Sequence, residues 1–178
     1  MTIENFWVQI NEAALRQGDF LPGCLVPIPV FDPTKFGKNS PTQEVEIEIE
    51  EYDLIILTQS CDLENGKISR VLLCPIYSIS EYEETNQGFK KKGVWNEVLT
   101  GRREGLHLLS SPISPENNRE ALVVDFRQVY SLPYDYVFKH ATQLGYRWRL
   151  KSPYLEHFSQ AFARLFMRVG LPSSIPRF

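Results

Sequence analysis

The residues of this chain that could do chemistry gather in the segment TQSCDLENG, residues 58–66. The four residues before it, Leu54 to Leu57, are all apolar, so the segment is expected at the end of a buried strand. A thiol in such a position can act as a nucleophile when helix-terminus amides and a histidine such as His107 favour its ionised form. Cys61 and its neighbour Asp62 are therefore candidate catalytic residues of a thiol-dependent enzyme.

The same pair also has a structural interpretation. An adjacent carboxylate raises the pKa of a thiol, so Asp62 disfavours the reactive thiolate. Cysteine is among the residue types most often buried, and aspartate commonly caps a helix or starts a turn. The sequence leaves both interpretations of Cys61 open.

A zinc site is a third alternative. Cys24, Cys61, Cys74 and His107 would form a Cys3His set if the fold brought them together, although 36, 12 and 32 residues separate them. Structural zinc sites usually start from a close C-x-x-C-type pair, which is missing here. Three cysteines without such a pair are typical of reduced thiols. We expect neither a metal nor another cofactor, and we expect Cys24 and Cys74 to be buried in apolar strands.

The segment YRWRLKSPY, residues 146–154, interleaves aromatic and basic residues, as single-stranded nucleic-acid binding requires. In a strand, however, alternate side chains point to opposite faces, which separates the two kinds. The two sets are Tyr146, Trp148 and Leu150, and Arg147, Arg149 and Lys151. We therefore expect the aromatic set to enter the core and the basic set to face solvent or a glutamate-rich strand. With a pI near 5.7, nucleic-acid binding is the less favoured alternative.

The net charge of −3 conceals a gradient along the 178 residues. Residues 1–60 sum to −7, residues 61–118 to −1 and residues 119–178 to +5. Such asymmetry is typical of a basic nucleic-acid face, of two chain ends that neutralise each other, or of separate protein partners. A composition of 43% hydrophobic and 23% charged residues favours one globular domain over residues 1–178. The chain has neither a membrane-length apolar run nor a signal-peptide pattern, so a cytoplasmic location is expected.

The elements that must position these residues follow from periodicity. Phe6, Ile10 and Ala13 keep helical spacing, which predicts a short amphipathic helix within the first fifteen residues, ending before Gly18. The next segment, residues 18–33, reads as an edge or bulged strand, because proline donates no ladder hydrogen bond. Its prolines are Pro22, Pro27 and Pro29.

Residues 44–50 alternate strictly, which predicts a strand with a wet glutamate face and a buried apolar face. The glutamate face holds Glu44, Glu46, Glu48 and Glu50, and the apolar face holds Val45, Ile47 and Ile49. We take Glu46, Glu48 and Glu50 as candidate partner-binding residues. Residues 54–57 and 70–79 are apolar on both faces and are expected to be central strands, joined through a turn at Asn65 and Gly66.

The second half of the chain continues the sheet. Residues 80–105 form a polar, peripheral insertion with a short helix at 94–99, and a helical turn is expected near 135–143. Further strands are expected at 106–111, 120–126, 127–133 and 146–150.

The strongest helix pattern lies at the C-terminal end, with Ser152 as N-cap, Pro153 in the first turn and Gly170 after the last. An apolar stripe at helical spacing predicts that this helix covers a sheet. The stripe consists of Leu155, Phe158, Phe162, Leu165, Phe166 and Val169. The opposite face carries His157, Gln160, Arg164 and Arg168, of which the two arginines are candidate partner-binding residues. The predicted fold is α+β: a small twisted or partly closed antiparallel β-barrel packed by this amphipathic helix.

Three motifs resemble the PemK/MazF toxin family, in which a small barrel of the Src-homology-3 type carries a closing helix and cuts single-stranded RNA. Gly18 and Asp19 match its opening GD, CPIYS at 74–78 matches its fourth strand, and Asp125, Arg127 and Gln128 match its DQIR strand. The resemblance covers residues 17–80 and 120–168. It implies Ser78 as the one carried-over catalytic candidate.

The chain departs from that family where RNA cleavage needs an arginine, in the loop before the central strand. Here the corresponding segment is EEYD, residues 50–53, whose charge repels a phosphate backbone. The chain is also similar to uncharacterised bacterial proteins with a strand-end Cys-Asp pair and an ending like RLKSPYLEHFSQAFARLFMRVG, residues 149–170. These occur in mobile or antiviral defence loci.

The interpretation that these observations favour is a non-catalytic adaptor or regulatory module of a prokaryotic system, in a defence or toxin–antitoxin locus. We expect it to bind a protein encoded nearby. The alternatives are a PemK-like endoribonuclease or single-stranded nucleic-acid-binding protein, and a thiol-dependent enzyme that uses Cys61.

Overall fold

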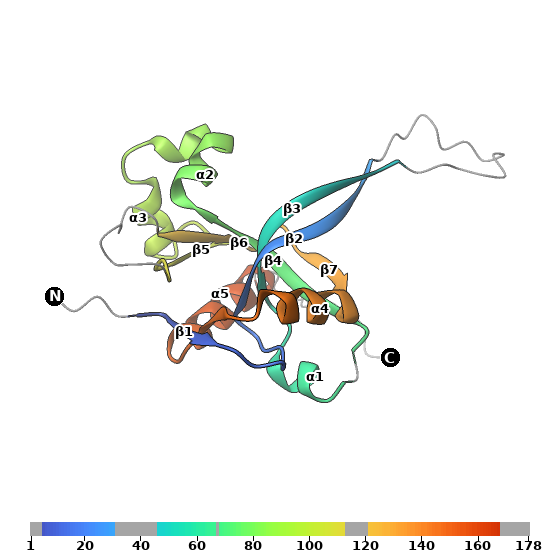
Figure 1. Cartoon of the computed structure of the whole chain (residues 1–178). Coiled ribbons are helices and arrows are strands. Elements are labelled where there is room, and N and C mark those ends of the chain that lie inside the picture. The colour runs from blue at the N-terminus through green and yellow to red at the C-terminus, as the bar shows by residue number, and fades with distance from the viewer. Residues whose placement is uncertain (1–4, 31–45, 67, 113–120, 168–178) are drawn as a thin grey trace, which may run out of the picture.

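The computed structural model describes residues 5–30, 46–66, 68–112 and 121–167, and it shows an α+β fold (Figure 1). Its described strands are β1 (Trp7–Ile10), β2 (Asp19–Val30), β3 (Glu46–Ile56), β4 (Arg70–Ser78), β5 (Leu106–Leu109), β6 (Leu122–Asp125), β7 (Tyr130–Pro133) and β8 (Arg147–Leu150). They form one antiparallel sheet in the order β1-β8-β2-β3-β4-β6-β5, and β7 pairs with β4. Within the described residues the sheet does not close on itself.

Helices lie around this sheet. Those described are α1 (Ser60–Glu64), α2 (Ile79–Thr85), the 3-10 helix η2 (Gln87–Lys90), α3 (Val94–Leu99), α4 (Tyr134–Leu144) and α5 (Tyr154–Phe166). The strands expected at 54–57 and 70–79 and the helices expected at 94–99 and near 135–143 are confirmed. In the part of the chain described here, no helix combines the length and the apolar character needed to cross a membrane.

The central strand β3 packs a core on each face. Leu54 and Ile56 belong to one cluster, which α4 covers with Val137 and Ala141. Ile55 belongs to a second cluster on the other face, which α5 covers. Because burying one large apolar side chain contributes about 1.5–3 kcal/mol, these two layers fix the strands around which the rest of the chain is arranged.

The peripheral segment α2–η2–α3 has a small core of its own. Tyr82, Phe89 and Val98 are buried there and pack against Leu106 and Val123 of β5 and β6. The segment is therefore anchored to the edge of the sheet by apolar contacts, on the side of the molecule opposite β7 (Figure 1).

The predicted N-terminal helix is wrong: residues 7–10 form β1, which pairs antiparallel with β8. Trp7 explains the difference, since it is fully buried beside Phe20 and its indole Nε1 donates a hydrogen bond to the Ser110 carbonyl at 2.7 Å. Pairing with a neighbouring strand satisfies the backbone of β1 and outweighs the weak helical spacing of a short segment.

Helix α5 covers the sheet as predicted, but its ends differ. It begins at Tyr154, and Pro153 rather than Ser152 is the N-cap residue, without a side-chain capping bond. Phe158 is fully buried, whereas Phe166 at the last turn is exposed. Val169 and Gly170, predicted at the end of the helix, lie outside the described residues.

A buried charge network joins the two oppositely charged ends of the chain. Asp19, fully buried, accepts hydrogen bonds from Arg147 Nε at 2.8 Å and from Nε and Nη2 of Arg149. Arg149 Nη1 also donates to Glu12 Oε2 at 3.0 Å, and Arg147 donates to the carbonyls of Glu12 and Ala14. Of the three explanations for the charge gradient, mutual neutralisation of the two ends is the one this contact supports.

The same network corrects part of the prediction for β8. Arg147 and Arg149 are buried against Asp19 and do not face solvent, and Tyr146 is 65% exposed. The rest of the prediction is confirmed, because Leu150 is buried, Trp148 packs against the same core cluster and Lys151 is exposed.

Candidate functional site

The outer halves of β2 and β3 leave the body of the molecule as a two-stranded arm (Figure 1). Cys24–Val30 pairs in register with Glu46–Tyr52, and the register shifts between Leu21 and Cys24. This bulge confirms the predicted bulged strand. Gly23 in the bulge has a φ of 66°, and its N–H donates to Asp53 Oδ1 at 2.9 Å.

One face of the arm is apolar and open to solvent. Leu25, Ile47 and Ile49 are 50%, 56% and 61% exposed, and the prolines between them are exposed as well. Cross-strand pairing places these residues side by side on one face. We name this surface the apolar strip; it consists of Leu25, Pro27, Pro29, Ile47 and Ile49.

The predicted burial of Ile47 and Ile49 is therefore wrong, because the glutamate face of β3 is the one that continues into the core. Opposite Tyr52 and Glu50 stand Cys24 and Val26, both fully buried. Helix α4 closes that face, where Leu25 N–H donates to the Tyr136 hydroxyl at 2.6 Å.

The predicted partner-binding glutamates lie on this arm. Glu46 and Glu48 are exposed, and Glu50 is half-buried and accepts a hydrogen bond from the Tyr52 hydroxyl. Among the described strands, β3 pairs on the side away from β2 only through Leu54–Ile56. Its outer half thus presents an unpaired strand edge beside the apolar strip.

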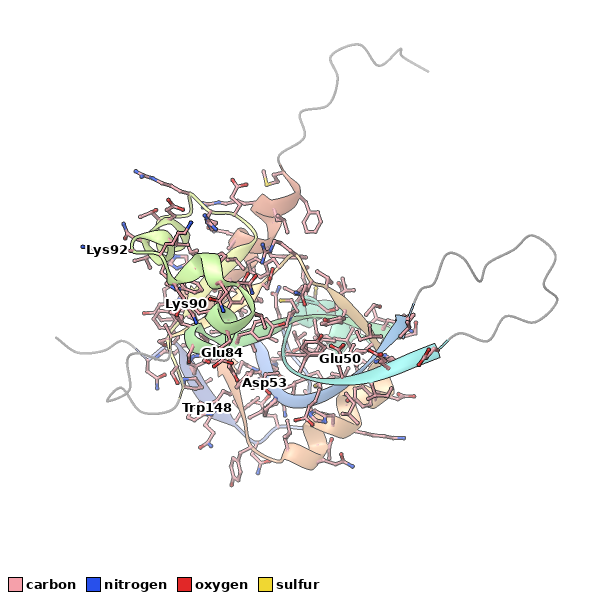
Figure 2. The ribbon with its side chains drawn as sticks, turned by 90° about the horizontal axis from the view of Figure 1, so that it is seen from above. Glu50, Asp53, Glu84, Lys90, Lys92 and Trp148 are labelled. Carbon is pink, nitrogen blue, oxygen red and sulfur yellow. The ribbon has the colours of Figure 1, made fainter. Side chains whose placement is uncertain are left out.

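A concave hollow of about 490 Å³ lies where β2, β3, β4 and β8 meet α2, and we name it the aromatic hollow. Its floor and walls are mostly apolar, and carboxylates stand among its lining residues. It is lined by Phe20, Pro22, Asp53, Ile76, Ser78, Glu81, Ser111, Pro112, Leu122, Tyr146, Arg147 and Trp148. Asp53 and Trp148 lie close together in the view of Figure 2.

Asp53 is exposed, but partial desolvation of its carboxylate raises its pKa; the Gly23 amide opposes this shift, and the nearby Glu81 and Glu51 carboxylates add to it. This carboxylate was not among the site residues predicted from the sequence. The signal was present, since Asp53 is an acidic residue placed directly before the buried run Leu54 to Leu57.

A second hollow of about 500 Å³ lies between α3, β5 and α5. His107, His157, Arg103 and the predicted Arg164 line it. Burial, with a smaller contribution from the neighbouring His157, lowers the pKa of His107 to about 4, so His107 is neutral near pH 7. Arg164 is exposed as predicted, and Arg168 lies outside the described residues.

Cys61 and Asp62 lie on the exposed surface of α1. Cys61 Sγ is 3.7 Å from Gln59 Oε1 and 3.8 Å from Asp62 Oδ1. The N-cap of α1 is Gln59, so the expected capping role of Asp62 is wrong. His107 is on β5, in the second hollow, and does not accompany the thiol.

Ser78, the residue carried over from the family resemblance, caps helix α2. Its Oγ accepts from Glu81 N–H at 3.2 Å and donates to Glu81 Oε2 at 2.7 Å, while Glu81 Oε2 also accepts from Ser78 N–H. This capping box explains the serine structurally. Ser78 is also far from Cys61. Leu72, whose carbonyl accepts a hydrogen bond from Leu57 near α1, is six residues from Ser78 along β4, which is about 20 Å at strand spacing. Cys61 and Ser78 therefore do not form one site.

The three cysteines are also apart from one another. Cys24 and Cys74 belong to different core clusters, and Cys61 is exposed. Desolvation raises the pKa of Cys24 to about 12 and raises that of Cys74 well above its ordinary value. Over the described ranges no group of three or more His, Cys, Asp or Glu side chains is placed to hold a metal.

These positions predict the order of thiol alkylation. At pH 8 and in native conditions, iodoacetamide should modify Cys61 at least about tenfold faster than Cys24 or Cys74, because only the thiolate reacts and the buried thiols are neutral. Peptide mass spectrometry over time measures the three rates. In denaturant the three rates should become similar, and equal rates without denaturant would contradict the burial of Cys24 and Cys74.

Two other residues on which the resemblance to the PemK/MazF family was based, Asp19 and Asp125, have structural partners. Asp19 is held in the charge network, and Asp125 accepts hydrogen bonds from Arg127 Nε at 2.8 Å and Nη2 at 2.6 Å. The segment at residues 50–53 lies within β3 and is not a loop. Comparison of the chain with family models, curated proteins and solved structures finds no match in any of the three.

Proposed function

We propose that this chain is a non-catalytic protein-binding module, an adaptor or regulator in a prokaryotic defence or toxin–antitoxin locus, and that its partner docks on the β2–β3 arm. The observation that carries the proposal is the apolar strip, in which two isoleucines and a leucine are at least half exposed beside two exposed prolines. Water-exposed apolar side chains in a contiguous patch are typical of interaction surfaces.

The groups that the arm exposes indicate what kind of surface the partner carries. The open edge of β3 offers backbone groups for strand addition, and β2 cannot do so at Pro27 and Pro29. Glu46 and Glu48 lie on the opposite face of β3 from the strip, where alternate side chains of an added strand would also lie. A complementary surface therefore carries an extended segment with apolar side chains and at least one basic residue.

The locus rests on resemblance. An antiparallel sheet covered by a helix is compatible with the small barrel of the PemK/MazF family, and the ending at 149–170 is like that of the uncharacterised bacterial proteins. Both resemblances support a protein encoded beside this chain as the partner. The two enzyme alternatives have less support. The Ser78 hydroxyl is hydrogen-bonded to Glu81, and within the described residues neither His107 nor Ser78 lies beside Cys61.

We expect two substitutions that introduce negative charge into the apolar strip to weaken partner binding. The protein captured from native extract by the wild-type chain is identified, purified and titrated against both forms by calorimetry. Ile47→Glu with Ile49→Glu should weaken its Kd about 30-fold or more, because truncated interface anchors commonly cost about 2 kcal/mol or more.

Leu99→Glu is the matched control, since Leu99 is 71% exposed on α3, away from the arm, and should leave Kd unchanged. Light scattering of the wild-type chain tests the alternative that a second copy covers the strip. Equal binding by the double variant and the control, or concentration-dependent dimers that only the double variant abolishes, would overturn the proposed docking of a different protein.

A further inference from the structure

The aromatic hollow combines two features that the proposed function does not use. Its walls include Phe20, Tyr146 and Trp148, and Asp53 and Glu81 add carboxylates from two different elements. Tyr146 is 65% exposed, so part of this aromatic surface is open to solvent. Aromatic faces and carboxylates together are the groups that recognise an organic cation.

The charge of the hollow is negative. Arg147 is the basic member of the described lining, and its guanidinium is already bound by Asp19 and by the carbonyls of Glu12 and Ala14. Glu81 and Asp53 therefore face the hollow without a basic partner in that lining. Asp53 Oδ1 accepts from Gly23, and Oδ2 has no hydrogen-bond partner within the described residues.

The size of the hollow limits the ligand. A volume of about 490 Å³ is at the lower end of small-molecule sites, enough for one alkyl chain with its terminal group. A planar guanidinium fits such a site better than an ammonium, since it stacks on an aromatic face and bonds a carboxylate through two N–H groups at once.

We propose that the aromatic hollow binds an alkylguanidinium cation, stacked among Trp148 and Tyr146 and bonded to the Asp53 and Glu81 carboxylates. The cation is the side chain of an arginine in a polypeptide or a free guanidinium compound. This site is separate from the arm, so its test does not depend on whether the proposed docking surface is correct.

The binding test titrates three probes into the full chain. Binding is monitored through the indole N–H signal of Trp148 in proton–nitrogen correlation spectra. The signal is assigned by its loss in Trp148→Phe. N-acetyl-arginine methylamide stands for the peptide-borne group, agmatine for the free compound, and N-acetyl-citrulline methylamide is the neutral isostere of the first. Both cations should shift the Trp148 signal saturably, and the citrulline probe should bind at least about tenfold more weakly.

Two conservative variants test the carboxylates without disturbing the fold. Asp53→Asn keeps an oxygen for the Gly23 amide, and Glu81→Gln keeps the capping box, because glutamine serves at that position too. Each should weaken binding of the cation about tenfold, whereas Glu156→Gln should not, because Glu156 is an exposed carboxylate on α5, a helix that contributes no residue to the described lining of the hollow.

Tighter binding of the peptide probe assigns the site to a polypeptide, and tighter binding of agmatine assigns it to a free compound. Equal affinity for the citrulline probe, no saturable shift with either cation, or the same loss in Glu156→Gln as in Asp53→Asn overturns the proposal. Retained binding in the Ile47→Glu, Ile49→Glu variant separates this site from the arm.

Discussion

Replacing Asp19 by asparagine should lower the free energy of unfolding by about 3–5 kcal/mol, the cost typical of removing one member of a buried ion pair. The carboxylate is fully buried and holds both Arg147 and Arg149, which are 3% and 8% exposed. Asparagine has nearly the same shape, so the substitution removes charge and leaves two buried guanidinium groups facing a neutral amide. Urea denaturation followed by circular dichroism measures the difference.

Glu12→Gln is the matched control for this prediction. It also neutralises a carboxylate bonded to Arg149, but that carboxylate is about half exposed and water replaces the lost contact. Its unfolding midpoint should stay close to that of the wild-type chain. If Asp19→Asn unfolded at the wild-type midpoint, or if both variants lost stability equally, the network would not be the buried junction described here.

The charge network also marks the limit of sequence reasoning in β8. Alternation separates Arg147 and Arg149 from Trp148, and the structure keeps that separation. The burial of the arginines depends on Asp19, 128 residues from Arg147 in sequence. A local pattern contains no information about that carboxylate, so the burial of the arginine face could not be predicted, whereas the burial of Leu150 on the other face was predicted.

The predicted burial of the apolar face of the arm was also wrong, because burial there depends on the rest of the fold. The alternation from Glu46 to Ile49 predicted a strand, which is confirmed. The side that enters the core is set by where the strand continues, and Tyr52 and Leu54 continue the glutamate face. Since the arm projects beyond the core, the rule that apolar residues are buried does not hold there.

Sequence patterns succeeded where a segment is apolar on both faces or amphipathic over several turns. Residues 54–57 are buried whichever way the strand turns, and the stripe of α5 allows one orientation only. The aromatic hollow could not be predicted, because its lining comes from five strands, one helix and two connecting segments. Asp53 and Trp148 are 95 residues apart in the sequence, as their numbers show.

Phe158→Ala should lower the free energy of unfolding by about 3–5 kcal/mol, because a fully buried phenylalanine leaves a cavity that its neighbours fill only in part. Phe158 is 0% exposed, and its ring lies 5.4 Å from the ring of Phe126 and 6.2 Å from that of His107. His107 lies on β5 and Phe126 directly follows β6, so the loss of stability measures how much the packing of α5 on the sheet contributes to folding.

Phe166→Ala makes the same chemical change two turns later on the same helix, where the side chain is 66% exposed and contacts Phe162. It should change stability by less than about 1 kcal/mol. Chemical denaturation of the two variants under identical conditions gives the comparison. Equal losses would mean that the whole stripe is buried to the same degree, and a small loss in Phe158→Ala would mean that the sheet keeps its structure without α5. A large loss in Phe158→Ala alone places the contact of α5 with the sheet at its middle turns, and that contact positions the strands from which both the arm and the aromatic hollow are built.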